Sequence, residues 1–175
     1  AAIGDGLEIW GGNTDDLVKG TRDANVIHGG DGDDRILGRK GDDIIMGDAG
    51  GDRLKGDNGN DVLIGGAGND KLIGGRGADR FTFDDIAMGR DKILDFGRGK
   101  DVIDLSALDA RDHTPDDDGF TVIGRARFSG DAGELRYGVK GGDAIVRGDT
   151  DGDGRADFAI RLVDTHRLHE SDFVL

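Results

Sequence analysis

The sequence contains no cysteine and only one proline among its 175 residues. Without cysteine the chain forms no disulfide, so a small fold that needs an extra restraint must take it from another source, such as bound ions. Basic residues are scarce, with 23 Lys and Arg against 37 Asp and Glu, and the net charge of −14 argues against nucleic-acid binding. No apolar run approaches the roughly 20 residues that span a bilayer, and no N-terminal signal peptide is recognisable.

Familiar catalytic motifs are missing as well. The sequence has no His-Glu-x-x-His zinc motif, no Gly-x-Ser-x-Gly elbow, no cysteine nucleophile and no phosphate loop. His166 and His169 have a spacing compatible with a metal pair, but a pair of surface histidines explains them better. We therefore expect no enzyme in this chain. We expect any catalytic domain, such as a protease, a glycan-active enzyme or a lipase, to lie upstream in a longer protein.

Glycine, by contrast, is abundant and periodic. Residues 11–82 divide into eight consecutive nine-residue units, each of which begins with Gly. The six units from Gly29 onward also have Gly at position four and Asp at position six, and position eight is apolar in all eight units. A fixed short period indicates a solenoid. The apolar residues at position eight are Val18, Ile27, Ile36, Ile45, Leu54, Leu63, Leu72 and Phe81.

The residue types of one unit predict its local structure. Glycine at positions one, two and four permits a tight turn, because it adopts positive φ at little steric cost. Positions seven to nine form a short strand whose apolar position eight faces inward. Two turns and two strands complete a coil of 18 residues, and successive coils stack about 4.8 Å apart.

This stacking aligns the residues at position six in two columns. Columns of like charge repel one another, and a hard divalent cation between neighbouring turns removes the repulsion. Ca²⁺ takes six to eight oxygens from carboxylates and carbonyls, which glycine-rich turns expose. The odd-numbered units contribute Asp16, Asp34, Asp52 and Asp70, and the even-numbered units contribute Asn25, Asp43, Asp61 and Asp79.

The units resemble the Gly-Gly-x-Gly-x-Asp-x-apolar-x nonapeptide of the RTX (repeats-in-toxin) family, best at residues 29–37 and 65–73. The resemblance implies an all-β fold, a right-handed parallel β-roll, and about four to six calcium ions. It places each ion between turns n and n+2, held by one Asp and two carbonyls from each turn. The strong sites then lie at Asp34/Asp52, Asp52/Asp70, Asp43/Asp61 and Asp61/Asp79, with a further site at Asp16/Asp34 and a doubtful one at Asn25/Asp43. The carbonyl ligands that the resemblance implies belong to Gly29, Gly30, Asp31, Gly32, Gly38, Arg39, Lys40, Gly41, Gly47, Asp48, Ala49, Gly50, Gly56, Asp57, Asn58, Gly59, Gly65, Gly66, Ala67, Gly68, Gly74, Gly75, Arg76 and Gly77.

A flexible Gly- and Asp-rich linker is the alternative to a solenoid. Eight in-frame units with an unbroken apolar position disfavour it, although it describes the state that we expect without calcium. We divide the chain into an N-terminal start of the roll (1–10), the repeats (11–82) and a C-terminal region (83–175). In the first segment, Trp10 either covers the open end of the core or is incidental.

The C-terminal region loses the nonapeptide but keeps alternating patterns. Strands are predicted near residues 91–96 and 101–106, and Asp91 and Asp101 are candidates for completing the last calcium sites; solvated carboxylates are the equal alternative. Further strands at 120–123, 134–139, 144–147 and 158–163 predict an antiparallel sheet that caps the roll, because an open end would leave strand edges unpaired. Asp149, Asp151 and Asp153 match half of an EF-hand loop, but Ile160 stands where its bidentate Glu belongs, so a turn is slightly favoured.

The last residues, Glu170 to Leu175, resemble the terminal signal of proteins exported by type I ABC transporters, and the wider tail resembles the C-terminal domain of serralysin-type proteins. We expect a secreted, calcium-folded module whose partners are calcium, this transporter and an upstream domain. Two other functions remain open. The outward row of Arg35, Arg53 and Lys71 suits an acidic polysaccharide, as in the R-modules of alginate epimerases, and a structural adhesin segment is the third possibility.

Overall fold

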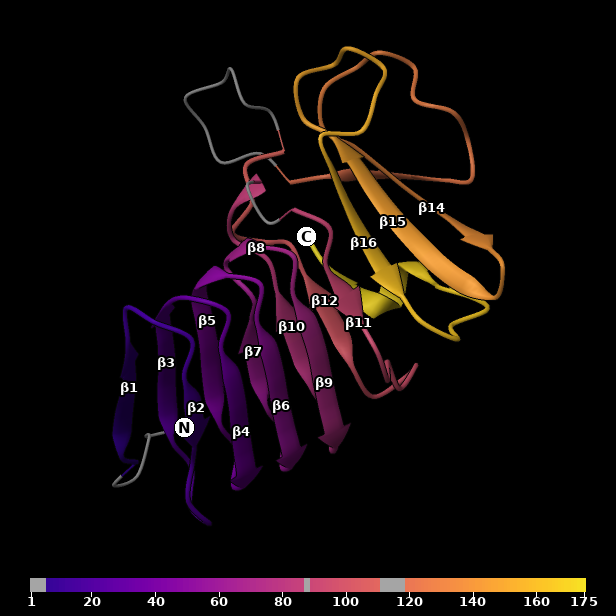
Figure 1. Cartoon of the computed structure of the whole chain (residues 1–175). Helices are drawn as coiled ribbons and strands as arrows, with labels where there is room; N and C mark the ends of the chain where they lie inside the picture. The colour runs from indigo at the N-terminus through magenta and orange to yellow at the C-terminus, as the bar shows by residue number, and fades with distance from the viewer. Residues whose placement is uncertain (1–5, 87–88, 111–118) are drawn as a thin grey trace.

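The computed structural model describes residues 6–86, 89–110 and 119–175, and these residues form two long β-sheets without an α-helix. Figure 1 shows the sheets facing each other along the N-terminal part of the chain. The first sheet runs β1 (Glu8–Gly12), β3 (Val26–Asp31), β5 (Ile44–Gly50), β7 (Val62–Ile64), β10 (Arg80–Thr82), β12 (Val102–Asp104) and β17 (Phe173–Val174), with β8 (Ala67–Gly68) also paired to β5. The second runs β2 (Leu17–Lys19), β4 (Arg35–Lys40), β6 (Arg53–Asn58), β9 (Lys71–Arg76), β11 (Lys92–Ile93), β16 (Phe158–Leu162), β15 (Asp143–Asp149), β14 (Glu134–Lys140) and β13 (Thr121–Gly124).

The repeat register confirms the predicted parallel β-roll. Strands of alternate units pair in parallel with equivalent positions opposite each other, as in Ile27↔Ile45 and Ile36↔Leu54. The side chains at position eight point between the sheets and form the core with the apolar residues that follow the repeats. Because each coil adds only two such side chains, the core of the roll is a narrow column.

The strands are longer than the three residues that the pattern predicts. In β4 and β6 they continue into positions one to three of the next unit. The chain turns at position two, where Arg39, Asp48 and Asp57 adopt the left-handed conformation with φ of 83°, 70° and 75°. Glycine relieves this strain in other units, for example at Gly66 with φ of 89°. Three units therefore carry a strained residue in the middle of the turn.

The roll continues beyond its last repeat. Lys92 pairs with Lys71, and Val102 pairs with Arg80, although 21 and 22 residues separate these partners instead of 18. Ile93 and Ile103 take the inward places of position eight and are fully buried. The two strands predicted in this region are thus present, shorter than expected, as an additional irregular coil.

The C-terminal strands extend the second sheet. Strands β14, β15 and β16 are antiparallel, as predicted, but β13 pairs with β14 in parallel, so this part of the prediction was wrong. Strand β16 pairs in parallel with β11 of the roll. One continuous sheet therefore leads from the repeats into the cap, and the two-residue strand β11 is the connection (Figure 1).

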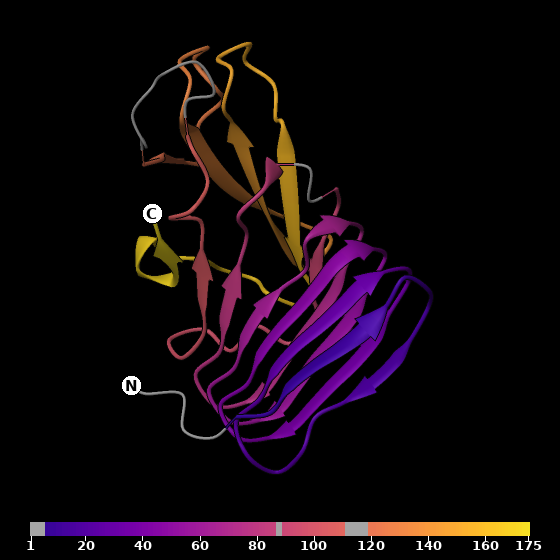
Figure 2. The same cartoon turned by 90° about the vertical axis from the view of Figure 1, so that its left-hand side faces the viewer.

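The two ends of the roll differ from each other. The strand at the C-terminus, β17, pairs in parallel with β12 (Figure 2). The Phe173 ring lies 5.9 Å from that of Tyr137. At the other end, Trp10 does not cover the core. It is 64% exposed and stacks on His28 on the outer face of the first sheet, because position nine points outward, while Ile9 packs against the core. Residues 1–5 of the predicted N-terminal segment lie outside the described residues.

Candidate metal centre in the turns

The position-six carboxylates form two hydrogen-bonded ladders. In each rung, one carboxylate oxygen accepts the backbone N–H of the position-six residue two units earlier: Asp52 Oδ1 accepts from Asp34 N at 2.8 Å, and Asp61 Oδ1 accepts from Asp43 N at 2.9 Å. The predicted columns are therefore present, with a backbone donor fixing the orientation of each carboxylate. The other rungs join Asp16 to Asp34, Asn25 to Asp43, Asp52 to Asp70, Asp61 to Asp79, Asp70 to Asp91 and Asp79 to Asp101.

The second oxygen of these carboxylates is buried without a partner. Seven side chains share this property: Asp34, Asp43, Asp52, Asp61, Asp70, Asp79 and Asp91. All but Asp34, at 3%, are only 1% exposed. A buried acceptor left without a hydrogen bond is destabilising, and more so when it is charged. Seven such oxygens in two regular rows indicate that another group binds there.

Glycine at position one shapes the space around each free oxygen. A Cβ added at Gly38 would lie 2.5 Å from Asp43 Oδ2 and 2.9 Å from the carbonyl oxygen of Gly56, two units later. The carboxylate and the carbonyl thus converge on a place that any larger residue would fill. Carboxylate and carbonyl oxygens are the ligands of hard cations such as Ca²⁺, so this donor set fits the ion that the sequence predicts.

Burial also disfavours the ionised carboxylates in the metal-free chain. Desolvation raises the pKa of Asp52 and of Asp61 from 3.8 to about 7, although the N–H donors of the ladder act in the opposite direction. The same cause raises the pKa of Asp91 to about 8. At neutral pH each of these buried carboxylates is therefore stable in the fold only when a proton or a cation neutralises its charge.

Comparison with known proteins agrees with this geometry. The profile of the RTX calcium-binding nonapeptide repeat (4 copies) matches residues 10–45 and 46–81. The chain belongs to the RTX calcium-binding repeat family. No curated protein matches the sequence.

Two solved structures of epimerase subunits are similar to this RTX chain. One is the AlgE6R2 subunit of the mannuronan C5-epimerase of Azotobacter vinelandii, 29% identical, with a TM-score of 0.61 over 97% of this chain and 93% of that one. The other is the AlgE6R3 subunit of the same enzyme, 31% identical, with a TM-score of 0.47 over 91% of this chain and 78% of that one. The first supports the β-roll fold along nearly the whole chain.

The ends of the two RTX columns differ from their middles. Asp91 behaves like a repeat residue: its Oδ1 accepts from Asp70 N at 2.8 Å and its Oδ2 is unpartnered. Asp101 also continues its column, but its Oδ2 accepts the N–H of Gly97 at 2.6 Å. At the other end, the amide oxygen of Asn25 accepts from Thr21 N at 2.6 Å. The Asp70/Asp91 pair is thus a complete counterpart of the repeat sites. At Asp101 and Asn25, by contrast, the corresponding side-chain oxygen already accepts a hydrogen bond from a backbone N–H group.

Further hydrogen bonds between turns, which the sequence reasoning missed, run along position five. The Oδ1 of Asp33 accepts from Gly51 N at 2.8 Å, and that of Asp42 accepts from Asn60 N at 2.8 Å. Asp and Asn recur at position five, at residues 15, 33, 42, 60 and 69, and this recurrence was the available signal. Because these residues bond turn to turn and are exposed, they account for acidic residues outside the metal columns.

The acidic turn at residues 149–157 is explained by its own hydrogen bonds. Oxygens of Asp149, Asp151 and Asp153 lie within 4.8 Å of one another. However, the two oxygens of buried Asp149 accept the N–H groups of Gly152 and Gly154 at 2.8 and 2.9 Å. This arrangement fits the favoured interpretation, a turn with spare carboxylates.

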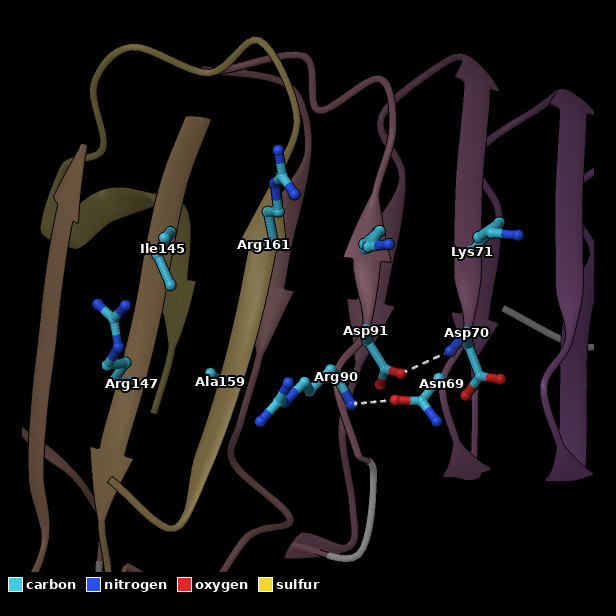
Figure 3. Close-up of a pocket in the computed structure, with 10 residues that line it drawn as sticks. Asn69, Asp70, Lys71, Arg90, Asp91, Ile145, Arg147, Ala159 and Arg161 are labelled. Atoms are coloured by element: carbon cyan, nitrogen blue, oxygen red, sulfur yellow. Dashed lines mark hydrogen bonds between the residues drawn. The ribbon is translucent and has the colours of Figure 1, made fainter. Parts of the chain in front are cut away.

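The predicted basic row is also in register. Arg35 pairs with Arg53, Arg53 with Lys71, and Lys71 with Lys92 across strands β4, β6, β9 and β11. The row ends in a hollow of about 620 Å³ on the same sheet, between the roll and the cap (Figure 3). Its cationic lining comes from Lys71, Arg90, Lys92, Arg147 and Arg161. Sequence reasoning found only the part of this surface that the repeats contain.

Proposed function

We propose that this chain is the calcium-dependent folding and export module of a larger secreted bacterial protein. The observation that carries the proposal is the set of seven buried carboxylate oxygens without partners, arranged in two columns with glycine-lined space beside them. Calcium would balance the negative charge of these carboxylates and would take their unpartnered oxygens as ligands. Because such sites exist only where coils stack, the ions bind the folded chain and not the unfolded one.

Each interior carboxylate would serve two neighbouring sites. On this basis the ions sit between Asp34/Asp52, Asp52/Asp70, Asp43/Asp61 and Asp61/Asp79, with Asp70/Asp91 as a fifth site. Carbonyls at positions one to four of the turns complete the shells. Asp16/Asp34 and Asp79/Asp101 are weaker candidates, because Thr14 replaces a glycine at the first and Gly97 already bonds Asp101 at the second.

Calcium concentration would then decide where the chain folds. A site with a Kd of about 10⁻⁴ to 10⁻³ M, as in extracellular modules, is empty in the cytosol and fills outside the cell. Each site at 100 times its Kd stabilises the fold by about 2.7 kcal/mol, so several sites together convert an unfolded chain into a folded one. The unfolded form suits passage through a type I transporter, with the signal at residues 170–175. Among the residues that the structure describes, no helix is long and apolar enough to cross a membrane.

The test is a Ca²⁺ titration followed by far-UV circular dichroism, with Mg²⁺ as the control ion. We expect a cooperative change from coil to β-structure with Ca²⁺ in the sub-millimolar to millimolar range and little change with Mg²⁺, which tolerates only near-octahedral sites. Native mass spectrometry of the folded chain counts the ions. A chain that is already rich in β-structure in excess chelator would refute the proposal.

A second function, binding of an acidic polysaccharide, is favoured by the basic row and the hollow that continues it. The chain has a net charge of −14, yet seven of its 23 Lys and Arg belong to this row and hollow. The similar AlgE6 subunits belong to a mannuronan C5-epimerase, an enzyme of a uronic-acid polymer. Pulldown on mannuronan with a triple variant, R35A/R53A/K71A, tests this function. If the variant were retained as strongly as the unchanged chain, the row would be excluded as the binding surface.

A further inference from the structure

The hollow at the junction of roll and cap is assembled from two separate parts of the chain. Lys71 comes from the roll, whereas Arg147 and Arg161 come from the cap strands β15 and β16 (Figure 3). Arg161 is paired with Asp143 through Nε at 2.6 Å. Within the described part of the chain, Lys71, Arg90, Lys92 and Arg147 have no ion-pair partner. Their positive charge is therefore available to a ligand.

Strand β11 is what brings the two parts together. It consists of two residues, and Lys92 pairs with Lys71 on one side and with Arg161 on the other. Arg90 and Lys92 flank Asp91 directly in the sequence. If β11 were to leave β9, the roll and cap cations would separate and the hollow would open. The attachment of β11 therefore controls this site.

Asp91 holds this attachment on both sides. Its Oδ1 accepts from Asp70 N at 2.8 Å, and its backbone carbonyl accepts from Arg161 N at 2.9 Å. The Asp70 carbonyl in turn accepts from Lys92 N at 2.9 Å. The remaining oxygens, Oδ2 of Asp70 and Oδ2 of Asp91, are buried without partners. When both are ionised, these two buried carboxylates oppose the contact unless a cation lies between them.

We infer that calcium at the Asp70/Asp91 site assembles the hollow into a binding site for the carboxylates of a uronic-acid polysaccharide, so that ion and polysaccharide bind cooperatively. This inference rests on the proposed calcium role of the position-six carboxylates. With β11 attached, the lining presents four unpaired cations beside Arg161, which is paired with Asp143, and Arg and Lys bind carboxylates through charge-assisted hydrogen bonds. Arg53 and Arg35 continue the positive row one strand at a time, which suits a polymer with a carboxylate on every sugar. No aromatic residue lines the hollow to stack a base, which disfavours single-stranded nucleic acid.

The experiment compares Asp91→Asn with Asp43→Asn in the full chain. Asn keeps the oxygen that accepts from Asp70 N and removes the charge that the ion requires. Asp43→Asn makes the same change in the even column, away from the hollow. Native mass spectrometry counts bound calcium, hydrogen exchange follows the amides of Lys92 and Arg161, and calorimetry measures binding of short oligogalacturonates, which calcium does not gel. Neutral dextran oligomers are the uncharged control.

At saturating calcium we expect Asp91→Asn to bind fewer ions, to exchange faster at Lys92 and Arg161, and to bind oligogalacturonate at least about fivefold more weakly than the unchanged chain. Asp43→Asn should also bind fewer ions but should keep the oligogalacturonate affinity. The hollow itself is tested by Arg147→Ala, which should keep every ion and lose affinity.

Three results overturn the inference, and they differ from one another. An Asp91→Asn chain that loses calcium yet binds oligogalacturonate normally excludes the coupling. An unchanged chain that takes up calcium but binds no oligogalacturonate excludes the polysaccharide site and leaves calcium-dependent folding intact. An unchanged chain that takes up no calcium refutes the proposed function together with the inference.

Discussion

Replacing Asp61 by Asn should change stability in opposite directions with and without calcium. Asp61 belongs to two of the proposed sites, its Oδ1 accepts from Asp43 N at 2.9 Å, and its Oδ2 is buried without a partner. Desolvation raises the pKa of this carboxyl from 3.8 to about 7, so the ionised form costs roughly 4 kcal/mol in the metal-free fold. Asn avoids that cost, although burying its amide costs about 1–3 kcal/mol.

The expected result is a gain of about 1–3 kcal/mol in chelator at pH 8 and a loss of about 2–4 kcal/mol in calcium. In calcium the variant loses two sites that at 100 times their Kd would each contribute about 2.7 kcal/mol, and its gain offsets part of that loss. Urea unfolding followed by circular dichroism measures the loss in calcium. A titration with trimethylamine N-oxide, an osmolyte that favours the folded state, measures the gain in chelator, where the chain is otherwise unfolded. Native mass spectrometry gives the ion count. Asp42→Asn is the matched control, since it removes the same charge from an exposed position. A variant that is destabilised equally in chelator and in calcium would refute the reasoning.

Three other predictions follow from the same geometry. Burial raises the pKa of the position-six carboxyls to about 6–8, above the unfolded value of 3.8. The metal-free fold therefore binds more protons than the unfolded chain. The concentration of trimethylamine N-oxide that folds the chain in chelator should rise as the pH rises from 5 to 8, whereas a constant concentration would contradict the burial argument. Gly38→Ala places a Cβ against Asp43 Oδ2 and should reduce stability in calcium by about 1–3 kcal/mol and lower the ion count, whereas Gly138→Ala, in open space, should change neither. Arg39→Gly removes a residue with φ of 83° and should raise the melting temperature by the equivalent of about 0.5–1 kcal/mol; Lys40→Gly, at an ordinary φ, should lower it.

The irregular coil after the repeats shows how the columns are extended without the nonapeptide. The chain inserts three extra residues between Asp70 and Asp91 and four between Asp79 and Asp101, and the strands still align. The strand positions keep their register across these longer connections, because the segments between strands tolerate changes in length better than paired strands do. This is why carboxylates outside any recognisable repeat continue both columns.

The sequence by itself determined the repeating part of this protein. A strict period of nine residues leaves one inward position per unit for the core and one for the carboxylates, so the parallel roll, the two columns and the row of Arg35, Arg53 and Lys71 follow from local spacing alone. Because each of these contacts joins residues 18 apart, it can be predicted without knowing how distant segments of the chain fold.

Only the tertiary structure decided what happens where the period ends. It distinguishes Asp91, with its free oxygen, from Asp101, whose oxygen is taken by Gly97, although both looked alike as isolated carboxylates. It joins β16 to β11 and so places Arg161 beside Lys92, about 70 residues earlier in the chain. No periodicity encodes such a pairing, because it depends on how the cap strands fold back on the roll. The hollow, and the coupling to the Asp70/Asp91 site that we propose, therefore emerge only from the assembled sheet.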